Sequence, residues 1–282
     1  MRIHRHADAG AFLRSAESWL LRSEPENNLV IGVAQTSSRQ ESGVDEYWAT
    51  VHDGGQVVGA AFRTPPFPLG LTRMPAGAIP ALLEDVMDVY RQLPGVAGPA
   101  TVAEPFARHW QEREGGSWRV RFFQRIYALT ELAVLAALPS GLLRSMDDSD
   151  ENLIWEWMDG FVRDTGISVP VERFVQSLLN DRRFFLWDDN GPRSVVAAGR
   201  DTPHGACITA VYTPSEYRAN GYASAAVAAL SRQILVSGKQ FCCLYTDLSN
   251  PTSNSIYAKI GYEPVRDDME LVFEQSRSYS AV

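Results

Sequence analysis

Residues 208–235 read ITAVYTPSEYRANGYASAAVAALSRQIL, and residues 241–264 read FCCLYTDLSNPTSNSIYAKIGYEP. Each stretch opens with a β-branched and aromatic run that is typical of a buried strand. Each then passes a turn signal and continues with apolar residues at helical spacing. Gly238 marks the end of the first helix, while Pro251 and Gly261 bound the second. The two stretches therefore predict the order strand, loop, helix, strand, helix.

The loop that leads into the first helix, Arg218 to Ala223, has the composition of an anion-binding turn. The first turn of a helix presents N–H groups without intrahelical acceptors and the positive end of the helix dipole, so it suits a pyrophosphate. Gly221 lets the backbone approach such a ligand closely, and Arg218 adds a forked positive charge. Gly221 alone would more often mark an ordinary strand-to-helix turn with an exposed arginine.

The second helix carries a polar stripe. Asn250, Asn254 and Tyr257 follow one another at i, i+4 and i+7, which places two amides and a phenol on one side. Ile256 and Ile260 fall on a different face and can pack on the sheet. Each polar residue also has a structural explanation, since Asn250 can cap the helix, Asn254 can be solvated and Tyr257 can belong to the core.

Together the two stretches resemble the acetyl-CoA site of the GNAT N-acetyltransferase superfamily. Residues 218–223 match the family's phosphate loop, Q/R-x-x-G-x-G/A. Asn250, Tyr257 and the pair Gly261-Tyr262 match its second motif, in the right order after one helix and one strand. A looser resemblance extends back to about Gly141.

The resemblance implies that an amine attacks the thioester of acetyl-CoA directly, with acetyl-CoA as cosubstrate. The strand around Val211 would diverge from its neighbour, so that its backbone binds the pantetheine arm and polarises the acyl carbonyl. The loop would hold the pyrophosphate, the two asparagines would bind the amide arm, and Tyr257 would protonate the leaving thiolate. The implied cofactor-binding residues are Ala210, Val211, Tyr212, Arg218, Ala219, Asn220, Gly221, Tyr222, Ala223, Ser224, Asn250 and Asn254.

The general base stays open among Asp247, Glu216, His204 and the Tyr212 phenol. The acceptor is expected to be an amine on a small molecule or a peptide, of unidentified structure. Two other functions stay open: a non-catalytic acyl-CoA sensor, and a transferase with a longer acyl or aminoacyl donor. The five histidines are scattered, so no metal site is predicted.

An internal repeat predicts two copies of one α/β unit. Residues 56–65, QVVGAAFRTP, match residues 194–203, SVVAAGRDTP, at a constant offset. We therefore expect two GNAT-like units, each a mixed, mostly antiparallel sheet flanked by helices: a degenerate one over residues 1–132 and a catalytic one over residues 141–276. The first copy has prolines where the second has its phosphate loop, and the acidic Glu104 where the second has Asn250.

Composition narrows the possible partners. A net charge of −8 and a pI near 5.2 argue against nucleic acid as a general partner. No run approaches the ~18 apolar residues of a membrane span, and the first residues lack a secretory signal. Cys207, Cys242 and Cys243 do not form a disulfide framework. The chain is expected to be cytoplasmic and not membrane-bound, and its oligomeric state cannot be read from the sequence.

Overall fold

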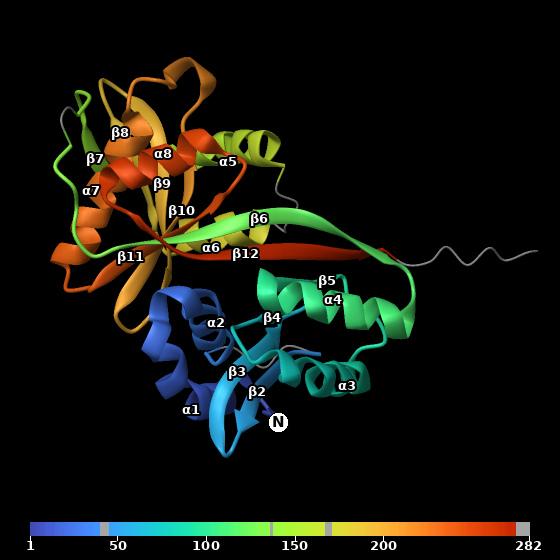
Figure 1. The fold of residues 1–282 in the computed structure, drawn as a ribbon. Coiled ribbons are helices and arrows are strands. Elements are labelled where there is room, and N and C mark those ends of the chain that lie inside the picture. The colour runs from blue at the N-terminus through green and yellow to red at the C-terminus, as the bar shows by residue number, and fades with distance from the viewer. Residues whose placement is uncertain (40–44, 136–137, 167–170, 275–282) are drawn as a thin grey trace, which may run out of the picture. The chain divides into compact units, whose positions relative to one another are not determined.

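The computed structural model describes residues 1–39, 45–135, 138–166 and 171–274 (Figure 1). The chain divides into two compact units. The first unit holds residues 1–126, 247–249 and the segment from residue 265 onward, and the second holds residues 127–246 and 250–264.

The first unit is a sheet with helices on both faces. Its strand order is β1-β2-β3-β4-β5-β12-β6, with β4 and β5 parallel and the pairs on either side of them antiparallel. Alternate residues of β2 face opposite helices: Tyr47 packs in the cluster of α3 and α4, and Trp48 in that of α1 and α2. The elements are β1 (Arg2–Arg5), α1 (Ala9–Leu20), α2 (Glu24–Ser37), β2 (Tyr47–Asp53), β3 (Gln56–Arg63), β4 (Leu69–Leu71), α3 (Ile79–Val89), β5 (Gly95–Pro99), α4 (Ala100–Glu114), most of β6 (Ser117–Leu129) and most of β12 (Glu263–Glu274).

The second unit repeats this plan. Its strand order is β11-β10-β9-β8-β7, parallel between β10 and β11 and antiparallel elsewhere. One face packs against α7 and α8, and the other packs against α5 and α6. Both units therefore have the predicted mixed, mostly antiparallel sheet flanked by helices. The elements are β7 (Leu142–Ser145), α5 (Glu151–Thr165), α6 (Val171–Asn180), β8 (Phe184–Asp188), β9 (Pro192–Asp201), β10 (Gly205–Tyr212), α7 (Tyr222–Val236), β11 (Phe241–Asp247) and α8 (Pro251–Ile260).

The element order is the same in the two halves of the chain, as the internal repeat predicts. Both halves run strand, two helices, three strands, helix, strand, helix, strand, so that β4-α3-β5-α4 corresponds to β10-α7-β11-α8. The helix α2, between Glu24 and Ser37, was not predicted from the sequence. Two adjacent asparagines precede an almost continuous apolar run that only Gly32 interrupts, so the sequence shows no clear helical spacing.

The last strand differs from the sequence-based division. It was expected to complete the second half, but β12 pairs antiparallel with β5 of the first, Leu271 opposite Val96 and Met269 opposite Gly98. Leu271 is fully buried in the α3–α4 cluster. Gly95 permits this pairing, since a Cβ there would come within 2.0 Å of the Leu271 carbonyl oxygen.

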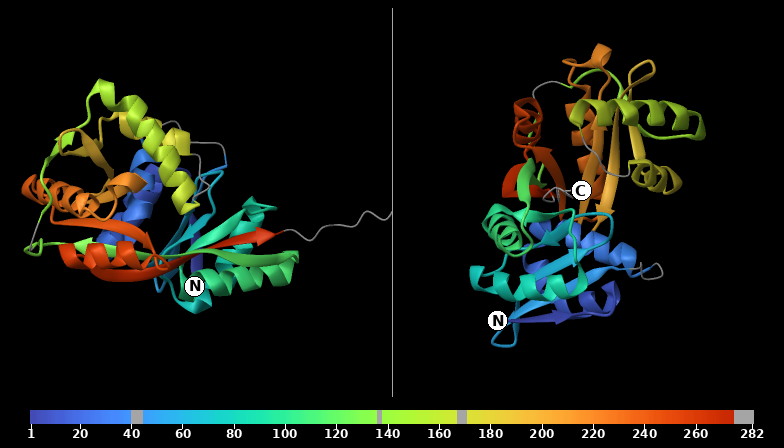
Figure 2. Two further views of the ribbon diagram at one scale, coloured as in Figure 1. Left: turned by 90° about the horizontal axis from the view of Figure 1, so that it is seen from above. Right: turned by 90° about the vertical axis from the view of Figure 1, so that its right-hand side faces the viewer.

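β6, the last strand of the first copy, in turn contributes its end to the second unit. The end of β6 contributes Tyr127 and Leu129 to the apolar cluster of the second unit. β6 and β12 lie side by side (Figure 2), and arginines of β6 pair with carboxylates of β12, as Arg121 does with Glu270 at 2.9 Å. The boundaries 1–132 and 141–276 therefore differ from the two compact units at the last strand of each copy. The apolar pattern of β6 or β12 does not specify which of the two sheets the strand joins. The assignment of a degenerate and a catalytic domain stays a prediction.

A buried ion pair fixes the start of the second unit. The Arg144 guanidinium donates to both oxygens of Asp150, at 2.6 and 2.9 Å, and to Asp188 at 2.9 Å. Asp150 is 5% exposed and also accepts the N–H of Asp147 at 2.8 Å. The bonds from Arg144 lower the pKa of Asp150 below its ordinary value.

Replacing Asp150 with asparagine is expected to lower the free energy of unfolding by about 2–3 kcal/mol at pH 7. A carboxylate whose pKa is lower in the folded state stabilises the fold above its unfolded-state value of about 3.9 and loses that contribution as the pH falls through the folded value. The difference between wild type and Asp150→Asn should therefore shrink below about pH 4. Urea unfolding from pH 7 to pH 2.5 measures it. A difference that is constant with pH would show that the carboxylate charge is not the cause.

Candidate active site

The strands β10 and β11 are joined only at their beginnings. Gly205, Ala206 and Cys207 pair with Phe241, Cys242 and Cys243, and within the described chain no further pairs between these strands follow. A bulge lies on the other edge of β10, where Ala210 and Val211 together oppose one residue of β9. Ala210 has a φ of 51°, in the left-handed region. Because a bulge bends its strand and leaves backbone groups unpaired, β10 turns away from β11 beyond Cys207.

The neighbours of Tyr212 hold the far end of β10 in place. The hydroxyl of Ser194 donates to the Tyr212 carbonyl at 3.0 Å. The phenol lies over Gly160 of α5, where an added Cβ would come within 2.4 Å of the Tyr212 oxygen. Ala210 is buried in the same cluster as α5. Neither Gly160 nor Ser194 was singled out from the sequence, since both fit ordinary helix and strand positions.

The loop before α7 turns sharply through two left-handed residues. Ala219 has a φ of 62°, and Gly221, the residue before the helix, has a φ of 81°. Asn220 stabilises the turn by donating its side-chain N–H groups to two preceding carbonyls, at 3.1 and 3.0 Å. The N–H groups of residues 222–224 form the first turn of α7 and have no acceptor within the helix. The loop thus enters α7 through a left-handed glycine, and its role as an anion-binding turn stays a prediction.

Arg218 is less available than the sequence suggested. Its Nη2 pairs with Asp164 of α5, and its Nε donates to the Thr213 carbonyl at 3.0 Å. Half of the Arg218 side chain and nearly half of the Asp164 side chain are exposed to solvent. Asp164 was missed from the sequence and partly neutralises the arginine. The end of α7 adds the positive end of its helix dipole to this loop.

The two asparagines of α8 have structural partners. Asn250 caps the helix by accepting the Ser253 N–H at 3.0 Å, and its carbonyl accepts the Asn254 amide at 2.8 Å. The Tyr127 hydroxyl, from the end of β6, donates to the Asn254 side-chain oxygen at 3.2 Å. Asn250 thus has the capping role that was its structural alternative, and Asn254 is bonded rather than merely solvated. Their cofactor-binding roles stay predictions.

Tyr257 is buried among aromatic rings. It is 8% exposed, and its ring centroid lies 6.4 Å from that of Tyr127 and 6.0 Å from that of Tyr262. Burial raises the pKa of Tyr257 to about 12. Within the described residues its hydroxyl makes no hydrogen bond. Tyr257 is therefore both a core residue and a phenol that keeps its proton at neutral pH.

The structure leaves the general base open. Asp247 accepts the Ser249 N–H at 2.7 Å, which is the capping role that a carboxylate has at such a turn. Glu216 accepts the hydroxyl of Ser215 at 3.2 Å. The carbonyl of His204 accepts the Gln240 N–H at 2.7 Å.

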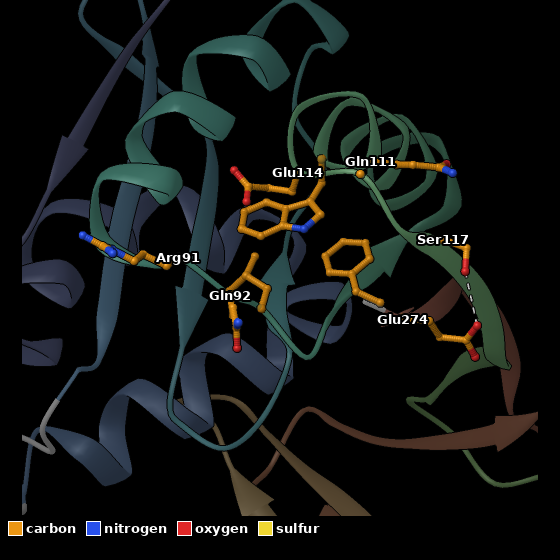
Figure 3. Close-up of a pocket in the computed structure, with 10 residues that line it drawn as sticks. Arg91, Gln92, Gln111, Glu114, Ser117 and Glu274 are labelled. Carbon is orange, nitrogen blue, oxygen red and sulfur yellow. Dashed lines mark hydrogen bonds between the residues drawn. The ribbon is translucent and has the colours of Figure 1, made fainter. Parts of the chain in front are cut away.

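The rest of the described structure offers a pocket but no metal cluster and no membrane-spanning helix. The described residues contain no His, Cys, Asp and Glu cluster suited to a metal ion, and none of their helices could span a membrane. A pocket of about 230 Å³ lies in the first unit, over the stacked rings of Trp110 and Phe273 (Figure 3). Its rim includes Ser117, whose hydroxyl donates to Glu274 at 3.3 Å. None of the predicted site residues lines it.

Known proteins share this architecture. Residues 191–271 match the family model described as "FR47-like protein". No curated protein matches the chain. An acetyltransferase of the GNAT family from Colwellia psychrerythraea superposes with a TM-score of 0.60 at 11% identity, over 97% of this chain and 100% of that one.

Two other solved structures are similar over nearly their whole length. A Drosophila protein reaches a TM-score of 0.65 at 12% identity, over 96% of this chain and 98% of that one. A GCN5-related N-acetyltransferase from Sphaerobacter thermophilus reaches 0.56 at 14% identity, over 98% and 97%. At these identities the likeness is one of fold.

Proposed function

The chain has the GNAT fold, as its two motifs predicted, and we propose that it is an N-acetyltransferase that moves the acetyl group of acetyl-CoA directly to an amine. The observation that carries the proposal is the parallel ladder of β10 and β11, which ends after Cys207 and Cys243 beside a bulge. A polar chain such as pantetheine needs backbone partners, and strands that separate within a sheet supply them.

The described residues fit acetyl-CoA as cosubstrate. The first turn of α7, entered through Gly221, would hold the pyrophosphate with the N–H groups of residues 222–224. Backbone groups of Ala210, Val211 and Tyr212 would pair with the pantetheine arm. Asn250 and Asn254 would need to release or share the bonds that they now make within α8.

The reaction itself would need two contributions from the chain. Backbone N–H groups at the bulge would stabilise the oxyanion that forms when the amine attacks the thioester carbonyl. Tyr257 would donate its proton to the departing sulfur. Burial raises the pKa of this phenol to about 12, and the same burial disfavours a free thiolate beside it, so proton transfer would accompany cleavage of the carbon–sulfur bond.

The first unit would not bind the cosubstrate. Its equivalent of the α7 loop enters α3 through the short 3-10 turn Ala76–Ala78, with Pro75 before it and Pro80 in the first turn of the helix. A proline has no N–H to donate. Glu104 in α4 would also repel a polyphosphate.

We expect the purified chain to bind one CoA per molecule and to release CoA from acetyl-CoA only when an amine is present. Calorimetric titration measures the stoichiometry. A thiol-release assay with a panel of amines, checked by the mass of the product, measures transfer. Binding without turnover of any acyl-CoA would indicate a sensor, and a clear preference for succinyl-CoA or a longer acyl-CoA would indicate a different donor. Two bound CoA molecules would contradict the assignment of the first unit.

A further inference from the structure

Arg200, near the end of β9, is a cation without a carboxylate partner. Its Nη2 lies 3.8 Å from the sulfur of Cys207, and its Cζ lies 6.0 Å from the centre of the Tyr245 ring. Its Nε is inaccessible to solvent and has no hydrogen-bond partner. Within the described chain no aspartate or glutamate pairs with it. The residue as a whole is partly exposed, so the guanidinium is buried on its Nε side and can still be approached by a ligand. A partly desolvated cation without a carboxylate favours the binding of an anion.

A nearby arginine makes the contrast clear. Arg183, at the start of β8, donates to the Asp201 carboxylate at 3.0 Å and to the Ala198 carbonyl at 2.6 Å. The fold thus supplies a carboxylate for Arg183 but none for Arg200, only one strand away.

The position of Arg200 coincides with the point where β10 and β11 separate. Cys207 and Cys243 are the last paired residues of these strands, and Tyr245 lies two residues farther along β11. Ala206 and Ile208 pack in the cluster of α7, whereas Cys207, Cys243 and Tyr245 form a separate cluster. Because alternate residues of a strand point to opposite faces, the guanidinium lies on the face away from α7.

The charge of Arg200 contributes to the lowered pKa of the neighbouring Cys207 thiol. The pKa of Cys207 is lowered to about 7, first because the Cys243 thiol donates to it and also because Arg200 and Arg183 are positively charged. Burial opposes this shift. A negatively charged group brought to this face would be stabilised in the same way.

The pyrophosphate of the cosubstrate cannot be this anion. The strand runs five residues from Cys207 to Tyr212, about 16 Å at ~3.3 Å per residue, before the α7 loop even begins. The thioester end of the cosubstrate, by contrast, would lie near the separation point. An anion beside Arg200 would therefore belong to the molecule that meets the acetyl group.

We propose that the acceptor is an amine that also carries a carboxylate, such as an amino acid, and that Arg200 binds this carboxylate at the separation point of β10 and β11. The inference rests on the proposed function. The forked N–H groups of arginine match the two oxygens of a carboxylate, and binding would give the unpaired guanidinium its missing partner. The amine of the acceptor would then be held on the side of the sheet opposite α7.

The test compares amino acids with their amides as acceptors for acetyl-CoA, using glycine, L-leucine, L-phenylalanine and L-glutamate. The two members of each pair have the same side chain, and the amide lacks the negative charge at the main-chain carboxyl group. We expect kcat/KM to favour the free acids by about 30-fold or more, because removing one partner of a desolvated ion pair is costly. In Arg200→Met this preference should disappear while the dissociation constant for CoA stays unchanged. Arg200→Lys should retain part of it.

Two controls separate this role from a structural one. Arg200→Met removes an unpaired charge, so its melting temperature should equal or exceed that of the wild type. Arg183→Met removes a neighbouring charge that is already paired with Asp201. It should lower the melting temperature but leave the preference for free acids.

Two results would overturn the inference without affecting the proposed function: equal acetylation of acids and amides, or an unchanged preference in Arg200→Met. An Arg200-dependent preference for succinyl-CoA would overturn the inference and would also change the donor in the proposed function, because it would place the carboxylate on the donor. If the chain binds no CoA, the proposed function fails by itself. In that case, saturation-transfer NMR with N-acetylglycine tests the carboxylate site at Arg200. Equal binding by the wild type and Arg200→Met, or no binding by either, rejects this site.

Discussion

Replacing Tyr257 with phenylalanine is expected to lower kcat for acetyl transfer by about 10²–10⁴-fold while the KM for acetyl-CoA changes little. The substitution keeps the ring that packs against Tyr127 and Tyr262 and removes only the hydroxyl. In the proposed mechanism that hydroxyl protonates the leaving sulfur, which matters only as the carbon–sulfur bond breaks. Steady-state kinetics with acetyl-CoA and an accepted amine, under conditions where chemistry limits the rate, measures both constants.

Tyr262 supplies a matched control. It is 2% exposed in the same cluster, and its hydroxyl lies 2.8 Å from the Ser231 hydroxyl. Tyr262→Phe removes an equally buried phenol oxygen with a structural partner, so it should reduce stability and leave kcat within about twofold of the wild type. If Tyr257→Phe behaves in the same way as this control, Tyr257 is a core residue and not the proton donor.

The substitution Gly221→Val is expected to weaken CoA binding by about 100-fold or more, because it would disturb at least two hydrogen bonds to a charged phosphate. Gly221 has a φ of 81°, which a β-branched residue rarely adopts. Its missing Cβ would meet only Pro139, at 3.7 Å, so a clash within the protein is not the cause. The loss would arise because the loop backbone shifts and the side chain occupies the approach of the ligand. Calorimetric titration with CoA measures the affinity.

The other end of the same helix provides the control for backbone strain. Gly238 follows α7, has a φ of 101° and has nothing within 4 Å of an added Cβ. Gly238→Val should therefore destabilise the fold about as much as Gly221→Val but leave CoA affinity unchanged. Equal affinities in the two variants would remove the phosphate-binding role from the loop.

The sequence alone determined β10, α7, β11 and α8 and their order. A β-branched run, a glycine and a helical repeat are local signals, and each depends on the backbone preferences of a few neighbouring residues. For this reason β10, the loop through Gly221, the start of α7 and the helix from Pro251 to Gly261 were predicted close to where the structure has them. The roles of these residues in cofactor binding and catalysis stay predictions.

Pairings between distant residues were decided only by the tertiary structure. The pattern of β12 requires an apolar face but does not say which sheet supplies it, and Gly95 leaves the room that lets β12 pair with β5. Asp164 beside Arg218 and the position of Arg200 beside Cys207 likewise depend on contacts between separate elements. In the sequence, Arg200 follows an apolar run and indicates only the end of a strand. The packed sheet shows in addition that its Nε lacks a hydrogen-bond partner. Local propensity specifies the elements of this protein, whereas long-range packing decides which charged groups meet.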